Sequence, residues 1–174
     1  KAEPVPLIVG ISSSAVDIIE QVKEIVMTLG PSRVRPYMAG ACQPFSIGAA
    51  LVQLLGVQAS VTTISAACPS GLDAVAVAAR KIRDGISDLV VVGAADSPLN
   101  APTIAAFIKA GLPSLTTEFA PQEVSRPFDA KRSGVVLSEG AGFIVLERLD
   151  SALARGATPY MEIVGGSTVT DTPG

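Results

Sequence analysis

Several features are missing from this sequence of 174 residues, and each absence excludes a class of protein or of site. The sequence contains no histidine, so a catalytic site that combines cysteine with histidine cannot lie within these residues. The net charge is −3 and no basic stripe is present to neutralise phosphates, which argues against a nucleic-acid partner. No stretch of about 18 residues runs without a polar or charged interruption, so we expect no membrane span. The first residues lack a basic region followed by an apolar stretch and a cleavage site, so we expect no signal peptide.

The composition is that of a soluble α/β domain, with 48% hydrophobic and 17% charged residues. The length suits one domain with enough apolar side chains for a core. The two cysteines, Cys42 and Cys68, could pair in principle. A reducing cytoplasm and a reactive Cys68 fit this cysteine usage better, so we expect a cytoplasmic protein.

Hydrophobic periodicity predicts strands and helices in alternation along the chain. Apolar or β-branched runs predict strands at residues 4–11, 60–66, 89–95, 140–147 and 160–170. Helical spacing of apolar residues predicts helices at residues 15–29, 45–55, 70–84 and 102–110, with a further helical turn at 151–155. Residues 114–132 are expected to form a loop. This order is typical of an α/β fold.

Cys68 lies where a β-branched run stops and an apolar helix begins. Pro69 stands where a first helical residue would be, a position that favours proline. The helix is apolar on nearly every side, so we expect it to be buried, with the thiol at its positive end. That end favours the thiolate, which attacks carbonyl carbon. A small buried cysteine that fills the corner between strand and helix is the alternative.

Four sequence blocks resemble those of the β-ketoacyl-acyl-carrier-protein synthases, and they occur in the family's order. Residues 65–74 (SAACPSGLDA) resemble the nucleophile motif T-A-C-x-S-G. Residues 125–129 (SRPFD) and 138–147 (SEGAGFIVLE) resemble the R-P-F-D and G-E-G-A-G blocks, and residues 90–96 (VVVGAAD) resemble the strand and turn between them. The resemblance covers most of the chain from about residue 31 onward.

The resemblance implies the thiolase fold, in which each of two similar halves has a five-stranded mixed sheet between helices. Residues 1–174 resemble an incomplete N-terminal half, either a fragment of a longer chain, which we favour, or a degenerate relative. The family's opening strand and its second half, with two catalytic histidines, have no match here. Without that opening strand, we expect the strands at 4–11 and 89–95 to lose a shared neighbour and leave unpaired backbone groups.

The activity implied by the resemblance is a decarboxylating Claisen condensation in fatty acid or polyketide biosynthesis. Cys68 would take an acyl group from a thioester, and the carbanion formed from a malonyl-carrier thioester would attack the acyl-cysteine. The backbone N–H of Cys68 is one candidate donor for the oxyanion. The family implies neither a metal nor a cofactor. The residues present allow acylation but not condensation, because the assisting histidines are absent.

Other residues match supporting positions of the family. Phe107 stands where a phenylalanine lines the acyl pocket, although it could be an ordinary core residue. Arg126 and Asp129 could form an ion pair that fixes their loop. Glu139 matches the acidic position of G-E-G-A-G and is expected to organise a buried polar network. Asp96 replaces the usual glutamate, which leaves its role open.

The resemblance also implies partners. These are acyl carrier protein, malonyl and acyl thioesters, and a second copy of the parent protein, paired through the strand at 60–66. Arg33, Arg35 and Lys109 are candidates for docking an acidic carrier, or they are ordinary surface charges. Two other functions stay open: a non-catalytic, chain-length-type partner subunit, and a thiolase-fold condensing enzyme that uses coenzyme A thioesters. The cysteine in the nucleophile block argues against the partner subunit.

Overall fold

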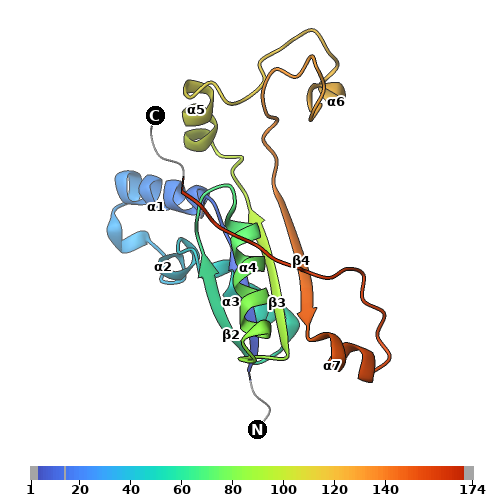
Figure 1. Cartoon of the computed structure of the whole chain (residues 1–174). Coiled ribbons are helices and arrows are strands. Elements are labelled where there is room, and N and C mark those ends of the chain that lie inside the picture. Colours follow the sequence, from blue (N-terminus) through green and yellow to red (C-terminus); the bar gives the residue numbers. More distant parts are fainter. Residues whose placement is uncertain (1–3, 14, 171–174) are drawn as a thin grey trace.

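The computed structural model describes residues 4–13 and 15–170, and it shows a four-stranded mixed sheet among helices (Figure 1). The strands are β1 (Val5–Gly10), β2 (Ala59–Ile64), β3 (Leu89–Asp96) and β4 (Gly140–Glu147). Their order in the sheet is β2–β1–β3–β4, with β1 parallel to both of its neighbours and β4 antiparallel to β3. The predicted α/β class is confirmed, although the described sheet has four strands rather than five.

Helices form at each place where the periodicity predicts them. They are α1 (Val16–Leu29), α3 (Ser46–Leu55), α4 (Ser70–Arg83), α5 (Ala101–Lys109) and α7 (Leu149–Ala154). The structure adds the short helices α2 (Met38–Ala41) and α6 (Pro121–Val124) and a 3-10 turn η1 (Pro31–Arg33), which were not predicted; α6 lies in the expected loop at 114–132. Local chemistry fixes several ends. The Oδ1 atom of Asn100 accepts the N–H of Thr103 at 3.0 Å at the start of α5. Gly56, with φ of 63°, ends α3 in the left-handed conformation that favours glycine.

The core lies between α4 and the sheet. Ile8 of β1 and Val90 and Val92 of β3 are at most 1% exposed, and they cluster with Ala74 and Ala78 of α4. The two alanines are four residues apart and therefore lie on one face of the helix. Small side chains on this face let α4 come close to the sheet.

The opposite face of the sheet is covered by α3, which packs on β1 and β2. A methyl group on Gly48 of α3 would collide with the side chain of Val61, so glycine permits the close approach. On the outer side of α4, Leu72 is 76% exposed. The expectation that this helix is buried on nearly every side is therefore wrong, because within the described residues only a short extended segment crosses its outer face (Figure 1).

The strands β1 and β3 are direct neighbours, with Leu7 opposite Val91 and Gly10 opposite Ala94. The expectation that they would lose a shared neighbour and leave unpaired backbone groups is wrong. Their edges pair with each other in parallel, so no gap remains between them.

Residues 160–170 form no strand, which corrects the prediction of a last strand there. This segment is extended but crosses the outer side of α4, away from the edges of the sheet (Figure 1). The hydroxyl of Thr168 donates a hydrogen bond to Oδ1 of Asp73 at 2.7 Å. The apolar residues of the segment thus have no strand to pair with. In the described part of the chain, none of the helices has the length and apolar character needed to span a bilayer.

Candidate active site around Cys68

A pocket of about 300 Å³ opens at one end of the sheet, where β1, β2 and β3 finish and β4 starts. Gly10 lies on its β1 side, Cys68 follows β2, Asp96 ends β3 and Gly140 begins β4. The parallel strands β1, β2 and β3 all direct their carboxyl ends to this edge. Ligands of α/β sheets bind at such an edge. The pocket is therefore our candidate active site.

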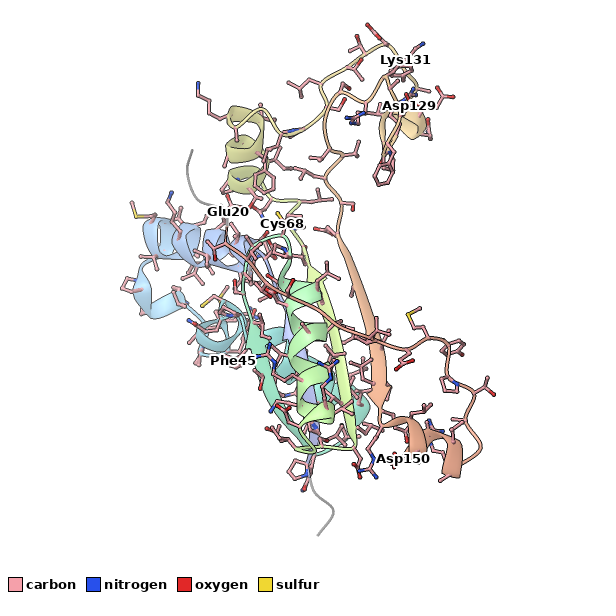
Figure 2. The ribbon with its side chains drawn as sticks, viewed as in Figure 1. Glu20, Phe45, Cys68, Asp129, Lys131 and Asp150 are labelled. Atoms are coloured by element: carbon pink, nitrogen blue, oxygen red, sulfur yellow. The ribbon has the colours of Figure 1, made fainter. Side chains whose placement is uncertain are left out.

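Cys68 stands in a tight turn between β2 and α4, and its side chain is exposed (Figure 2). The residue before it, Ala67, has φ of 58°, an uncommon conformation for a residue with a β-carbon. Pro69 is the N-cap and the helix begins at Ser70, as predicted. An exposed thiol on the pocket wall does not fit a cysteine that fills a buried corner.

Ser70 fixes the shape of this turn. Its side chain is 2% exposed, and its hydroxyl accepts the backbone N–H of Ala66 at 2.8 Å while it donates to the carbonyl of Ala67 at 2.5 Å. The N–H of Ser70 also donates to the carbonyl of Ala67, at 3.1 Å. One serine thus binds both Ala66 and Ala67, the two residues that precede Cys68.

The start of α4 packs closely against the sheet at two glycines, Gly10 and Gly71. A methyl group on Gly10 would lie 2.5 Å from the carbonyl oxygen of Ser70, so β1 and α4 meet there backbone to backbone. A methyl group on Gly71 would lie 3.1 Å from the β-carbon of Ala94 on β3. Glycine at both places lets the turn that carries Cys68 sit on the ends of β1 and β3.

Asp96 and Glu139 join neighbouring strands at the pocket edge. The carboxylate of Asp96 accepts the backbone N–H of Ser12 at 3.0 Å and that of Ser13 at 3.0 and 3.1 Å. Glu139 accepts a hydrogen bond from the hydroxyl of Ser97 at 2.6 Å, and it is exposed. The expected buried network around Glu139 is therefore not formed in the described structure, because this residue precedes an edge strand that is open to solvent.

The predicted ion pair between Arg126 and Asp129 is present, with Nη1 and Oδ2 3.8 Å apart. Arg126 also stacks over the ring of Phe119, 3.6 Å from its centroid, and its Nε donates to the carbonyl of Glu123 at 2.9 Å. Figure 2 shows Asp129 far from Cys68, in the loop beyond α5. The pair therefore organises its own loop and does not line the pocket.

Phe107 and Cys42 lie outside the pocket. Phe107 is half-buried on α5 and is not among the residues that line the cavity beside Cys68. Cys42 is partly buried at the end of α2, with its thiol 3.5 Å from the carbonyl oxygen of Ala39. A role for Phe107 in acyl binding stays a prediction.

The ion pairs that shift pKa values lie at the other end of the sheet. A hydrogen bond from Arg155 lowers the pKa of Glu147, and one from Arg148 lowers the pKa of Asp150. Figure 2 shows Asp150 at the far end of the sheet from Cys68. Among the described residues, no three histidine, cysteine, aspartate or glutamate side chains are close enough to hold a metal ion.

Sequence reasoning found Cys68 but missed Ser70 and left Asp96 without a role. A serine in the first turn of a predicted helix is a weak signal that it bonds to nearby backbone groups. No comparable signal links Asp96 to Ser12 and Ser13, because more than eighty residues separate these partners.

Comparison with known proteins gives a consistent set of similarities. Residues 1–152 match the family model described as "Beta-ketoacyl synthase, N-terminal domain". A "Putative polyketide beta-ketoacyl synthase 1" from Streptomyces halstedii is 42% identical over 138 residues, which cover 78% of this chain and 32% of the relative.

Solved structures give the same picture. The ishigamide ketosynthase/chain length factor superposes with a TM-score of 0.78 at 28% identity and covers 94% of this chain and 40% of that one. A type II PKS acyl-carrier protein in complex with its ketosynthase bound to the hexaketide gives a TM-score of 0.72 at 28% identity, covering 86% of this chain and 39% of that one. The chain thus spans about a third of the length of the curated relative.

Proposed function

The chain belongs to the β-ketoacyl synthase family, and we propose that it is the acyl-accepting part of a condensing enzyme, with Cys68 as the nucleophile. We further propose that residues 1–174 form an N-terminal ketosynthase half-domain of a longer protein. The names of the Streptomyces relative and of the ketosynthase bound to a hexaketide favour polyketide over fatty acid biosynthesis.

The observation that carries this proposal is the exposed thiol in a constrained turn on the wall of a pocket. The thiolate sulfur of Cys68 would attack the carbonyl carbon of an acyl thioester. The new sulfur–carbon bond forms, the bond to the donor thiol breaks, and that thiol leaves with a proton. The acyl-cysteine remains a thioester, so its carbonyl keeps the reactivity that condensation requires.

The oxyanion formed in this attack needs hydrogen-bond donors. Among the described residues, the backbone N–H of Cys68 makes no hydrogen bond to the protein, so it is free to donate. It lies just before α4, a helix of 14 residues whose first N–H groups add positive potential. The N–H of Cys68 is therefore our candidate for one oxyanion donor.

Condensation requires groups that this sequence does not contain. Loss of carbon dioxide from a malonyl thioester needs donors for the developing enolate and a group that handles protons. The sequence has no histidine to serve in either task. We therefore assign acylation to these residues and assign decarboxylation to residues of the proposed parent protein beyond them.

The proposed partners are acyl carrier protein, the acyl and malonyl thioesters it carries, and a second copy of the parent protein. One structural relative is itself a complex of a ketosynthase with an acyl-carrier protein. The strand β2 lies at one edge of the sheet, and its Val61 is 37% exposed, which supports pairing through this edge. A cytoplasmic location fits the proposal, since both described cysteines are free.

A chain-length-type partner subunit is the second candidate, because one solved relative is a ketosynthase/chain length factor. Such a subunit would need no reactive thiol. The exposed Cys68 favours the catalytic role over this one.

The test is an assay of the full-length protein with acyl- and malonyl-carrier thioesters, with 3-ketoacyl product measured by mass spectrometry. We expect product from the unchanged protein and from Cys42→Ala, and background only from Cys68→Ala. Absence of product from the unchanged protein, or full product from Cys68→Ala, would contradict the proposed function.

A further inference from the structure

The turn that presents Cys68 contains a conformation that needs support. Ala67 has φ of 58°, where the β-carbon crowds the following backbone, so an alanine in an open loop would move to a negative φ. Ala67 is itself exposed, so burial does little to hold it in place. The hydrogen bonds around it supply a restraint.

These hydrogen bonds converge on the side chain of Ser70. The hydroxyl donates to the carbonyl of Ala67 at 2.5 Å and accepts from the N–H of Ala66 at 2.8 Å, so it bridges the peptide groups on both sides of the Ala66–Ala67 bond. Ser70 is 2% exposed, which shields both bonds from competing water. Its backbone is fixed in turn by the close approach to Gly10.

We propose that Ser70 is a positioning residue, whose hydroxyl holds Ala67 in the left-handed conformation and so keeps the Cys68 thiol beside the start of α4. This inference rests on the proposed function of Cys68 as the nucleophile. Without the hydroxyl, Ala67 relaxes to a negative φ and the thiol moves away from the helix start. The thiol then leaves its place on the pocket wall, where an incoming electrophile reaches it.

The test measures how fast iodoacetamide labels Cys68 relative to Cys42 in the full-length protein, by quantitative peptide mass spectrometry. We expect Ser70→Ala to slow the labelling of Cys68 about three- to tenfold and to leave Cys42 unchanged. Ser65→Ala is the matched control, because Ser65 is an exposed serine of the same segment, and it should change neither rate.

A second substitution separates positioning from general loss of structure. Glycine adopts a positive φ without strain, so Ala67→Gly in the Ser70→Ala background should restore at least half of the lost Cys68 rate. If Ser70→Ala does not fold, the labelling rate of Cys68 in Ala67→Val takes its place as the test. Valine is β-branched and disfavours the positive φ, while the hydroxyl of Ser70 remains. We expect Ala67→Val to slow the labelling of Cys68 as well.

The outcomes are distinct. An unchanged Cys68 rate in Ser70→Ala or in Ala67→Val would overturn the positioning role, and so would a loss that Ala67→Gly does not recover. Equal labelling of Cys68 and Cys42 in the unchanged protein would instead contradict the proposed nucleophile itself.

Discussion

At the scale of single residues, the pocket depends on two glycines whose lack of a side chain allows close packing. Gly10 leaves room for the carbonyl of Ser70, and Gly71 leaves room for Ala94. Because the turn that carries Cys68 packs directly on these contacts, we expect a single added methyl group at either glycine to displace the thiol.

Gly10→Ala tests this contact. The added methyl group would lie 2.5 Å from the Ser70 carbonyl oxygen, and the neighbour is backbone, which cannot swing aside. We expect a loss of about 1–3 kcal/mol in the free energy of unfolding, together with slower labelling of Cys68. Denaturant unfolding measures the first and mass spectrometry the second. Gly165→Ala is the control, because nothing lies within 4 Å of that position, and equal effects of the two substitutions would contradict the packing argument.

Phe107 tests whether α5 takes part in substrate binding. If its ring lines an acyl pocket in the parent protein, Phe107→Ala should change which acyl chain lengths are accepted more than it lowers the thermal midpoint. A phenylalanine that is mainly core would cost about 3–5 kcal/mol on truncation, and this one is only half-buried. Unchanged chain-length preference together with a large loss of stability would assign Phe107 to the core.

At the scale of secondary structure, the corner between β4 and α7 is held by an ion pair. Two nitrogens of Arg155 contact the carboxylate of Glu147, the shortest contact being 2.8 Å. The hydrogen bond from Arg155 holds the pKa of Glu147 below its ordinary value of 4.5. A lowered pKa in the folded state means that the pair stabilises at neutral pH and that this contribution is lost as the pH falls through the folded-state pKa, below about 4.5.

We therefore expect Glu147→Gln to lower the thermal midpoint at pH 7 and this difference to shrink as the pH falls from about 4.5 toward 3. The measurement is a series of thermal unfolding curves between these two pH values. Glu162→Gln is the control, because Glu162 is exposed and forms no ion pair among the described residues. A difference between Glu147→Gln and the unchanged protein that does not shrink at all as the pH falls to 3 would show that the pair does not act through charge.

The elements that could be predicted from sequence are those whose periodicity is strong. The four observed strands fall within two residues of the predicted ranges, because apolar and β-branched runs with turn residues at their ends indicate strands. Residues 160–170 were also predicted as a strand, but their apolar side chains find no sheet edge. Strand pairing depends on distant residues, and a local pattern cannot supply it.

The same distinction applies to the site. Cys68 could be found because the change from strand to helix is local. The direct pairing of β1 with β3, and the hydrogen bonds from Ser12 and Ser13 to Asp96, depend on residues distant in sequence. Ser70 is local, but its importance rests on the positive φ of Ala67, which the sequence does not reveal in a residue other than glycine.

At the scale of the whole molecule, many large apolar side chains of the described residues are exposed. Large side chains that are at least 82% exposed include Phe128, Tyr160, Met161, Val164 and Val169. The sheet also has two outer strands, β2 and β4. Exposed apolar surface and open strand edges both favour association.

We therefore expect residues 1–174, expressed alone, to self-associate and to make no condensation product. Association follows from the exposed apolar side chains and strand edges, and not from an empty slot between β1 and β3, since these two strands are paired. Sedimentation velocity over a range of concentrations measures it. A monomer at every concentration, with a cooperative unfolding transition, would contradict this expectation.

The central claim is that Cys68 accepts an acyl group, and peptide mapping after acyl transfer tests it most directly. The full-length protein is incubated with an acyl thioester, digested without reductant, and analysed by mass spectrometry. The account predicts a mass increase equal to the acyl group on the peptide that contains Cys68, and loss of that mass after treatment with hydroxylamine, which cleaves thioesters. The Cys42 peptide and the Cys68→Ser variant should carry no acyl group that hydroxylamine removes. No acylation at all, or acylation of Cys42 in place of Cys68, would contradict it.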